Sequence, residues 1–265
     1  MEAQIQPTEK TAEVPKARRY RRATLLDTCR GIAVVNMIFY HLLYDYQVLF
    51  GNNRAWDEQT RVRLWQQLIC CSFVLLSGWV WRLGKRNNLR RGVMLNLLGF
   101  IITLITLLLF PQAPIWFGIL NFIGCAVLLM IPLEKPLRRI PRLVGAAVSL
   151  LLFILTYSLP NGAVGLPMLL TIRLPRALYR FPALAFLGFA PQNFFSADYF
   201  PLLPWFFLYL FGYFLGGFCM ALPGFEQIAR CRLPPFDAVG RYSLWIYLAH
   251  QPLCMAICWM LVNLP

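Results

Sequence analysis

The sequence predicts an all-α integral membrane protein, a bundle of about seven transmembrane helices with a cytoplasmic N-terminus. First, 59% of the 265 residues are hydrophobic and only 14% are charged, whereas a soluble domain carries about 25% charged residues. Second, the mean hydropathy of +0.58 comes from long apolar segments, each close to the roughly 20 residues that cross a bilayer. Third, Lys and Arg collect in alternate loops. A soluble enzyme, a disordered chain and a disulfide scaffold are excluded.

The apolar segments place the helices in chain order. The predicted spans are about Thr24–Phe50, Leu64–Leu83, Val93–Phe110, Ile115–Leu133, Leu143–Leu159, Leu203–Leu222 and Leu244–Val262. The segment Phe181–Ala190 is too short to cross and is expected to be re-entrant or interfacial. Residues 1–22 are polar and basic, and are expected to form a disordered cytoplasmic tail. Residues 23–265 then form one helical domain.

The basic residues indicate the orientation. The formal net charge is +14, from 25 Lys and Arg against 11 Asp and Glu. Eighteen of the 25 lie in the tail and in alternate loops, and six lie in the opposite loops. Because cytoplasmic loops are enriched in Lys and Arg, we expect the tail inside and the C-terminus outside. This distribution explains the charge better than nucleic-acid binding does, so no nucleic-acid partner is expected. The cysteines lack metal-ligand spacing with His, so no metal is expected.

The first span carries an unusual set of polar side chains. At about 100° per residue, Asp27, Arg30, His41 and Asp45 fall within an arc of roughly 60°. They form one seam about 27 Å long, which must face a bundle interior or a water-filled path. Asp27 and Arg30, and likewise His41 and Asp45, have the spacing of helical pairs. The seam could only hold helices together. Alternatively, His41 beside a carboxylate is a general base with an orienting partner.

Several segments of the chain resemble a known family. The stretch 26–33, LDTCRGIA, followed by His41, is similar to the first helix of the transmembrane acyltransferases. That group includes the acyltransferase family 3 proteins and the heparan-alpha-glucosaminide N-acetyltransferase relatives. SFVLLSG at 72–78 and YSLWIYLAHQP at 242–252 resemble its second and final helices. HLLYD at 41–45, FGIL at 117–120 and DYFPLLPW at 198–205 resemble the short bacterial members of the heparan-alpha-glucosaminide branch.

The resemblance implies a membrane-embedded transferase. Members move an acyl group, usually acetyl from acetyl-CoA, to a hydroxyl or amine of a glycan or related small acceptor. His41 then matches the essential histidine, as general base or acyl carrier, and Asp45 would orient its imidazole. Acetyl-CoA carries phosphates, for which arginine is well suited. The expected phosphate ligands lie at the cytoplasmic face and are Arg30, Arg82, Lys85, Arg86, Arg90 and Arg91, although topogenic charge explains many of these.

Other residues are expected to support the site. They are Asp27, Ser77, Trp116, Asn121, Asp198 and His250. Asp198 could bind an acceptor hydroxyl, whereas His250 is equally well explained as a satisfied interhelical histidine. The expected location is the inner membrane, with lipids as neighbours and a second copy of the chain as a candidate partner. A transporter with a proton or solute path and an inert assembly subunit are the alternatives.

Overall fold

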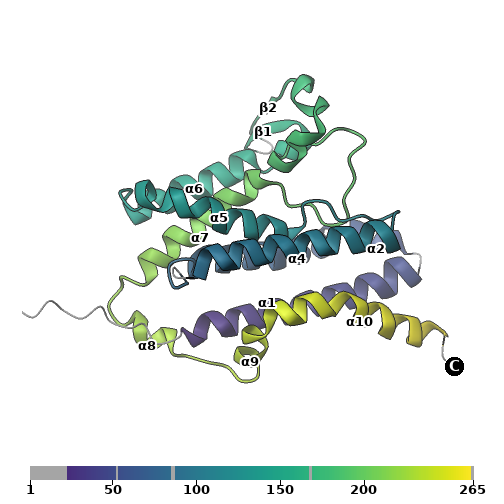
Figure 1. Ribbon diagram of the computed structural model, residues 1–265, viewed down its shortest axis with the longest axis horizontal. Coiled ribbons are helices and arrows are strands. Elements are labelled where there is room, and N and C mark those ends of the chain that lie inside the picture. Colours follow the sequence, from purple (N-terminus) through teal and green to yellow (C-terminus); the bar gives the residue numbers. More distant parts are fainter. Residues whose placement is uncertain (1–22, 52, 85–86, 167–168, 264–265) are drawn as a thin grey trace, which may run out of the picture.

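The computed structural model describes residues 23–51, 53–84, 87–166, 169–263. The expected tail, residues 1–22, lies outside them. The described chain is a helical bundle (Figure 1) with one small two-stranded sheet. Its long helices are α1 Thr24–Tyr44, α3 Thr60–Val80, α4 Asn88–Leu109, α5 Ile119–Leu137, α6 Arg142–Thr156, α7 Leu202–Cys219 and α10 Ser243–Asn263. The predicted all-α membrane class is confirmed.

Six of the described helices are long and apolar enough to cross a membrane. They are α1 with its extension to Phe50, α4, α5, α6 with its extension to Asn161, α7 and α10. The remaining long helix, α3, has the length of a span, but Arg61 and Arg63 occupy its first turn. The prediction of seven spans therefore becomes six by length and composition. The chain is a multi-pass membrane protein.

The outer surface of the bundle is apolar, as a lipid-facing surface must be. Helix α4 has Leu97, Phe100, Leu104 and Leu108 largely exposed, and Leu108 is 72% accessible. A helix that is hydrophobic all round belongs in a membrane or a large core. Inside, one apolar cluster joins α3, α5, α6 and α7, and a second lies between α1 and α3.

Small residues allow the helices to pack closely. An added Cβ at Gly78 of α3 would lie 2.0 Å from the backbone oxygen of Tyr209 in α7. One at Gly212 of α7 would lie 2.3 Å from the backbone oxygen of Leu75. Only glycine permits such contact between helix backbones, the usual way in which membrane helices associate. The crossing fixes α3 against α7.

The connections complete the fold. Helix α1 continues as a π-helix, η1 Asp45–Phe50, and short α2 Arg54–Glu58 follows it. Short α8 Phe225–Ala229 and α9 Phe236–Arg241 lie at the other end of the bundle, beside the start of α1 (Figure 1). Residues 243–263 of α10 run alongside α1 in the same direction, because Ile38 contacts Cys254 and Leu42 contacts Cys258.

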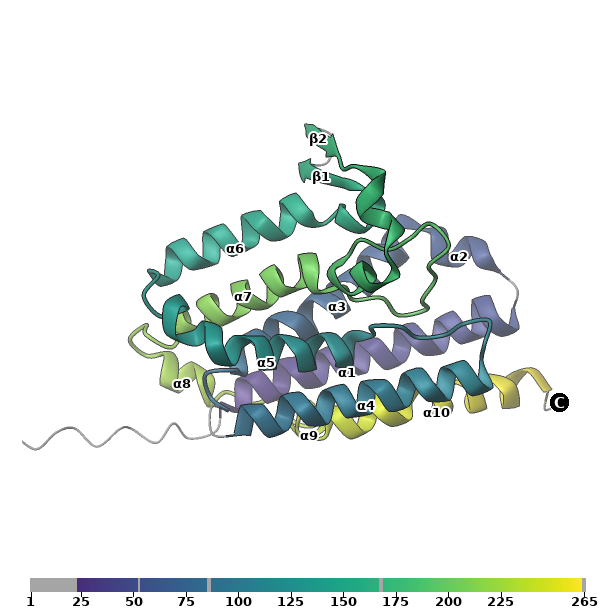
Figure 2. The same cartoon turned by 45° about the horizontal axis from the view of Figure 1, so that its top comes forward.

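The segment between α6 and α7 departs from a purely helical prediction. It contains the 3₁₀ turns η3 Leu159–Asn161, η4 Arg176–Arg180 and η5 Pro182–Leu187. It also contains an antiparallel hairpin of β1 Ala163–Leu166 and β2 Leu170–Arg173, with Val164 opposite Ile172. The hairpin projects sideways beyond the end of α6 (Figure 2). The segment predicted to be too short to cross, 181–190, is indeed a short turn and not a spanning helix.

Candidate functional site

The polar seam of α1 turns inward, away from lipid. Asp27 is buried, and its carboxylate accepts a hydrogen bond from Arg30 at 3.0 Å. The backbone here crosses α9 very closely, since a Cβ at Gly240 would lie 1.7 Å from the backbone oxygen of Asp27. The predicted pairing of Asp27 with Arg30 is confirmed. This end of the seam is therefore a helix contact, and Arg30 is occupied by its carboxylate neighbour.

The middle of the seam meets α10. The ring centroids of His41 and His250 lie 4.7 Å apart in an edge-to-face arrangement. His41 is half-buried, and Tyr40 packs against its ring at 5.5 Å. The only two histidines of the chain thus face each other across one interhelical contact. Intramembrane ionisable side chains that meet in this way are rare, and they usually have a functional role.

The protonation of His250 follows from its neighbours. Its Nδ1 lies at hydrogen-bond distance from the backbone oxygen of Tyr247, and its buried Nε2 has no hydrogen-bond partner among the described residues. A carbonyl can only accept, so Nδ1 carries the proton and donates it. In the neutral ring Nε2 then keeps a free lone pair. His250 therefore presents an unused acceptor beside His41.

Asp45 lies one turn beyond His41 and has a different partner from the predicted one. Its fully buried carboxylate accepts hydrogen bonds from Nε2 of Gln251 at 3.0 and 3.3 Å. Among the described residues no hydrogen bond joins Asp45 to His41. Asp45 also begins the π-helical segment, a feature that often marks functional sites. The carboxylate is held by α10, and it lies near the imidazole without orienting it through a hydrogen bond.

A second polar group lies inside the bundle, between α3, α4 and α7. The guanidinium of Arg91 donates to Oγ of Ser77 at 3.3 Å, and Ser77 is buried. Tyr209 is fully buried nearby, and no hydrogen-bond partner within the described residues reaches its hydroxyl. Arg91 therefore points into the bundle and not toward the solvent at its end. Ser77 and Arg91, predicted as separate features, belong to one cluster.

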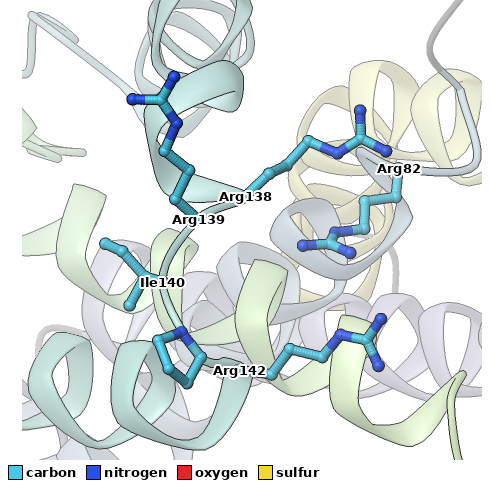
Figure 3. Close-up of a pocket in the computed structure, with 6 residues that line it drawn as sticks. Arg82, Arg138, Arg139, Ile140 and Arg142 are labelled. Atoms are coloured by element: carbon cyan, nitrogen blue, oxygen red, sulfur yellow. The ribbon is translucent and has the colours of Figure 1, made fainter.

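The other predicted cationic ligands are dispersed. Arg82 lies at the end of α3, with its guanidinium carbon 4.2 Å from the ring centre of Tyr213. Arg90 is exposed, and Lys85 and Arg86 lie outside the described residues. Arg82 lines a cavity with Arg138, Arg139 and Arg142 (Figure 3). These three belong to the alternate loops whose charge indicates orientation, and the sequence alone predicts no site for them.

The remaining support residues gather at the opposite end of α5. Asp198 accepts a hydrogen bond from the backbone N–H of Ile119 at 3.1 Å, so it caps the first turn of α5. Burial raises the pKa of its carboxyl to about 6. Trp116 is 38% exposed, and Asn121 is buried against Gly99 with no partner for Oδ1 in the described chain. The contacts of Asp198 and Asn121 serve helix capping and packing, and no hydrogen bond within the described residues joins any of the three side chains to His41.

Two aspects of the site escaped sequence reasoning. Gln251 is the hydrogen-bond donor to the Asp45 carboxylate. It stands next to His250 in the motif at 242–252, but it was not predicted as a site residue. Apart from their positive charge, nothing in the sequence indicates that the arginines around the cavity lie together. Within the described ranges, no three His, Cys, Asp or Glu side chains are grouped so that they could hold a metal ion.

Comparison with known proteins gives one match. The family model "Heparan-alpha-glucosaminide N-acetyltransferase, catalytic" matches residues 22–252, which include His41, Asp45 and His250. No curated protein and no solved structure matches significantly. The family match covers most of the chain, including five of the six candidate spanning helices in full and the first ten residues of α10. The chain therefore belongs to the heparan-alpha-glucosaminide N-acetyltransferase catalytic-domain family.

Proposed function

We propose that this membrane transferase moves an acetyl group from acetyl-CoA to an amine or hydroxyl of a glycan or related envelope acceptor, with His41 as the catalytic base. The observation that carries the proposal is the meeting of His41 and His250 between α1 and α10, with ring centroids 4.7 Å apart. Family membership supports acetyl transfer. The imidazole is the side chain best suited to take and return a proton near neutral pH.

The proposed step is a direct transfer. The acceptor O–H or N–H gives its proton to the unprotonated nitrogen of His41 while its lone pair attacks the thioester carbonyl. The carbon–sulfur bond of the tetrahedral intermediate then breaks, and the thiolate of CoA leaves. The thiolate takes the proton from the His41 imidazolium. The products are the acetylated acceptor and free CoA, and His41 returns to its neutral form.

His250 and Asp45 act on His41 in different ways. His250 keeps an unused acceptor at Nε2, so it can share the proton that His41 takes up. Asp45 has no hydrogen bond to His41, but residues four apart on a helix lie on the same face at about 6 Å. Its hydrogen bonds to Gln251 tie this face of α1 to α10 and so hold His41 beside His250. Both are positioning residues for His41.

The bundle supplies an orientation for this reaction. The turns α3–α4 and α5–α6, the helix ends that adjoin them and the segment α8–α9 carry ten of the 17 described Arg and Lys residues, and they share one end of the bundle (Figure 1). We propose that this basic end is cytoplasmic, in the inner membrane, as the positive-inside rule favours. Acetyl-CoA would then enter from the cytoplasm, and α2 and the hairpin would face the opposite side, where an envelope acceptor is found.

The test is turnover in liposomes with acetyl-CoA, glucosamine and mixed envelope glycans. His41→Ala should lower CoA release at least 100-fold, because general base catalysis contributes about 10²–10⁴-fold. Phe39→Ala is the matched control, since Phe39 is two residues away on α1 and 57% exposed. It should insert and turn over normally. Full acetyl transfer by a correctly inserted His41→Ala protein would refute the proposal.

A further inference from the structure

A cavity of about 420 Å³ opens at the basic end of the bundle. It is lined by Arg82, Arg138, Arg139, Ile140, Pro141 and Arg142. Four of the six lining residues carry a guanidinium, and none carries a carboxylate. The α5–α6 connection and the first residue of α6 contribute five of them, and the turn after α3 contributes Arg82 (Figure 3). The positive charges around this cavity repel each other, and a bound anion would offset that repulsion by its attraction to each of them.

Arg82 is held in place before any ligand arrives. Its guanidinium carbon lies 4.2 Å from the ring centre of Tyr213. Gly217 leaves room for it, since a Cβ there would lie 3.0 Å from the same carbon. Its Nε is buried and finds no hydrogen-bond partner in the described residues. Arg82 is thus a preorganised cation with an unused donor, which reduces the entropy cost of binding an anion.

The start of α6 adds a second attraction for an anion. Pro141 precedes the helix as its N-cap and Arg142 is its first residue, so the cavity adjoins the N-terminal turn of a 15-residue helix. The free N–H groups and the positive end of the helix dipole favour an anion there. Arg142 is itself a cation at the N-terminal end of α6, where the helix dipole disfavours positive charge. An anion bound between Arg142 and the helix end would offset this repulsion.

Glu134 offsets part of the positive charge around the cavity by pairing with Arg138. Oε1 of Glu134 lies 3.9 Å from Nε of Arg138, too long for a hydrogen bond, and the Arg138 side chain is 61% exposed. In the close-up, Arg138 and Arg142 extend toward the side on which Arg82 lies, whereas the guanidinium of Arg139 turns away (Figure 3). The guanidiniums of Arg82, Arg138 and Arg142 can therefore converge on one ligand, although Arg138 also forms a long ion pair with Glu134.

We propose that this cavity is a phosphate site, in which Arg82, Arg138 and Arg142 bind a phosphorylated ligand at the N-terminus of α6. Paired phosphates are the anions that several guanidiniums and a helix N-terminus recognise together. One source is the phosphorylated nucleotide end of CoA, and in that form the inference rests on the proposed function. The other source is the phosphate of an anionic lipid headgroup, since the cavity lies at the end of the membrane-spanning helices.

The experiment compares two double variants of the full-length protein. Arg138→Gln/Arg142→Gln removes two charges from the cavity. The matched control, Arg230→Gln/Arg232→Gln, removes two charges from exposed residues near α8 at the same end of the bundle. The first arm measures CoA and pantetheine binding in phosphatidylcholine nanodiscs by calorimetry. The second arm counts cardiolipin bound in mixed nanodiscs by native mass spectrometry. Ligand-free melting temperatures report on folding.

The outcomes separate the two sources. The inference expects the cavity variant, and not the control, to bind CoA about 100-fold more weakly, roughly tenfold for each lost charge-assisted contact. Phosphate-free pantetheine should bind both variants equally. A loss of bound cardiolipin alone supports the lipid source. If both ligands bind the cavity variant as they bind the control, the arginines are topogenic and the inference is wrong.

Two further measurements keep this result independent of the reaction and of folding. Arg142→Lys keeps the positive charge and should retain part of the CoA affinity. A variant that binds weakly because it is misfolded would instead show a lower melting temperature. His41→Ala should abolish transfer without changing CoA affinity. If CoA affinity depends on the cavity but wild-type protein transfers nothing, the phosphate site stands and the proposed reaction fails. If transfer depends on His41 but the cavity variant binds CoA and cardiolipin as the control does, the proposed reaction stands and the phosphate site is refuted.

Discussion

Replacing Gln251 with Ala removes the only hydrogen-bond donor to Asp45 that is found in the described residues. The amide Nε2 lies 3.0 and 3.3 Å from the two carboxylate oxygens, and the Asp45 side chain is fully buried. A hydrogen bond to a charged group contributes about 1.5–3 kcal/mol, and an unsatisfied buried charge adds its desolvation cost. We expect Gln251→Ala to lower the free energy of unfolding by roughly 2–3 kcal/mol.

A double-mutant cycle isolates this contact. The variants are Gln251→Ala, Asp45→Ala and their combination, unfolded with SDS in mixed micelles. The expected coupling energy is about 1.5–3 kcal/mol, because removing both partners leaves no unpaired charge. Gln66→Ala on the exposed side of α3 is the control, and it should change stability by less than about 0.5 kcal/mol.

The same variants report on function. If Asp45 positions His41, Gln251→Ala should keep measurable transfer, whereas Asp45→Ala should lower kcat by about tenfold or more. Strictly additive effects of the two substitutions on the free energy of unfolding would refute the reasoning, because the carboxylate and the amide would then be energetically independent.

Three further predictions follow from the structure. Gly240→Ala should destabilise the fold by about 1–3 kcal/mol or more, because its Cβ would lie 1.7 Å from the backbone oxygen of Asp27. Gly84→Ala is the control in the same SDS titration, since its Cβ would lie 3.1 Å from Oδ1 of Asn88 and 3.9 Å from the backbone oxygen of Val80. Asp198→Asn should flatten the pH dependence of stability. The folded-state pKa is raised to about 6 from 3.8, so wild-type protein loses this contribution as pH rises through that window; an unchanged melting-temperature profile would contradict this. His250→Ala should lower kcat about tenfold or more and shift the pH–rate profile while leaving KM unchanged; a loss of stability with an unaltered profile would indicate packing alone.

Periodicity and apolar length identified most of the helices. Each of the seven predicted spans corresponds to one long helix, with ends displaced by a few residues, because the length of an apolar run is a local property of the chain. The polarity of the first turns of α3 was equally visible at Arg61 and Arg63. The hairpin Ala163–Arg173 was not predicted, since strands this short carry little alternation and depend on their pairing.

The site was predicted in part. The angular positions of Asp27, Arg30, His41 and Asp45 required only the geometry of one helix, and the structure turns all four inward. The partner of His41 was not accessible in this way. His250 lies seven residues into α10 and His41 seventeen residues into α1, and the axial offset that aligns them is set by α9 packing beside the start of α1.

The sequence by itself determined that this chain is a helical membrane protein with a polar seam on its first helix, because hydrophobic length, helical period and charge asymmetry are local properties. Only the tertiary structure decided that His41 meets His250, that Asp45 binds Gln251, and that Arg82 joins the arginines of the α5–α6 connection. These contacts join residues far apart in the chain. Their formation depends on glycine-mediated helix crossings and axial offsets, which arise only when the helices pack.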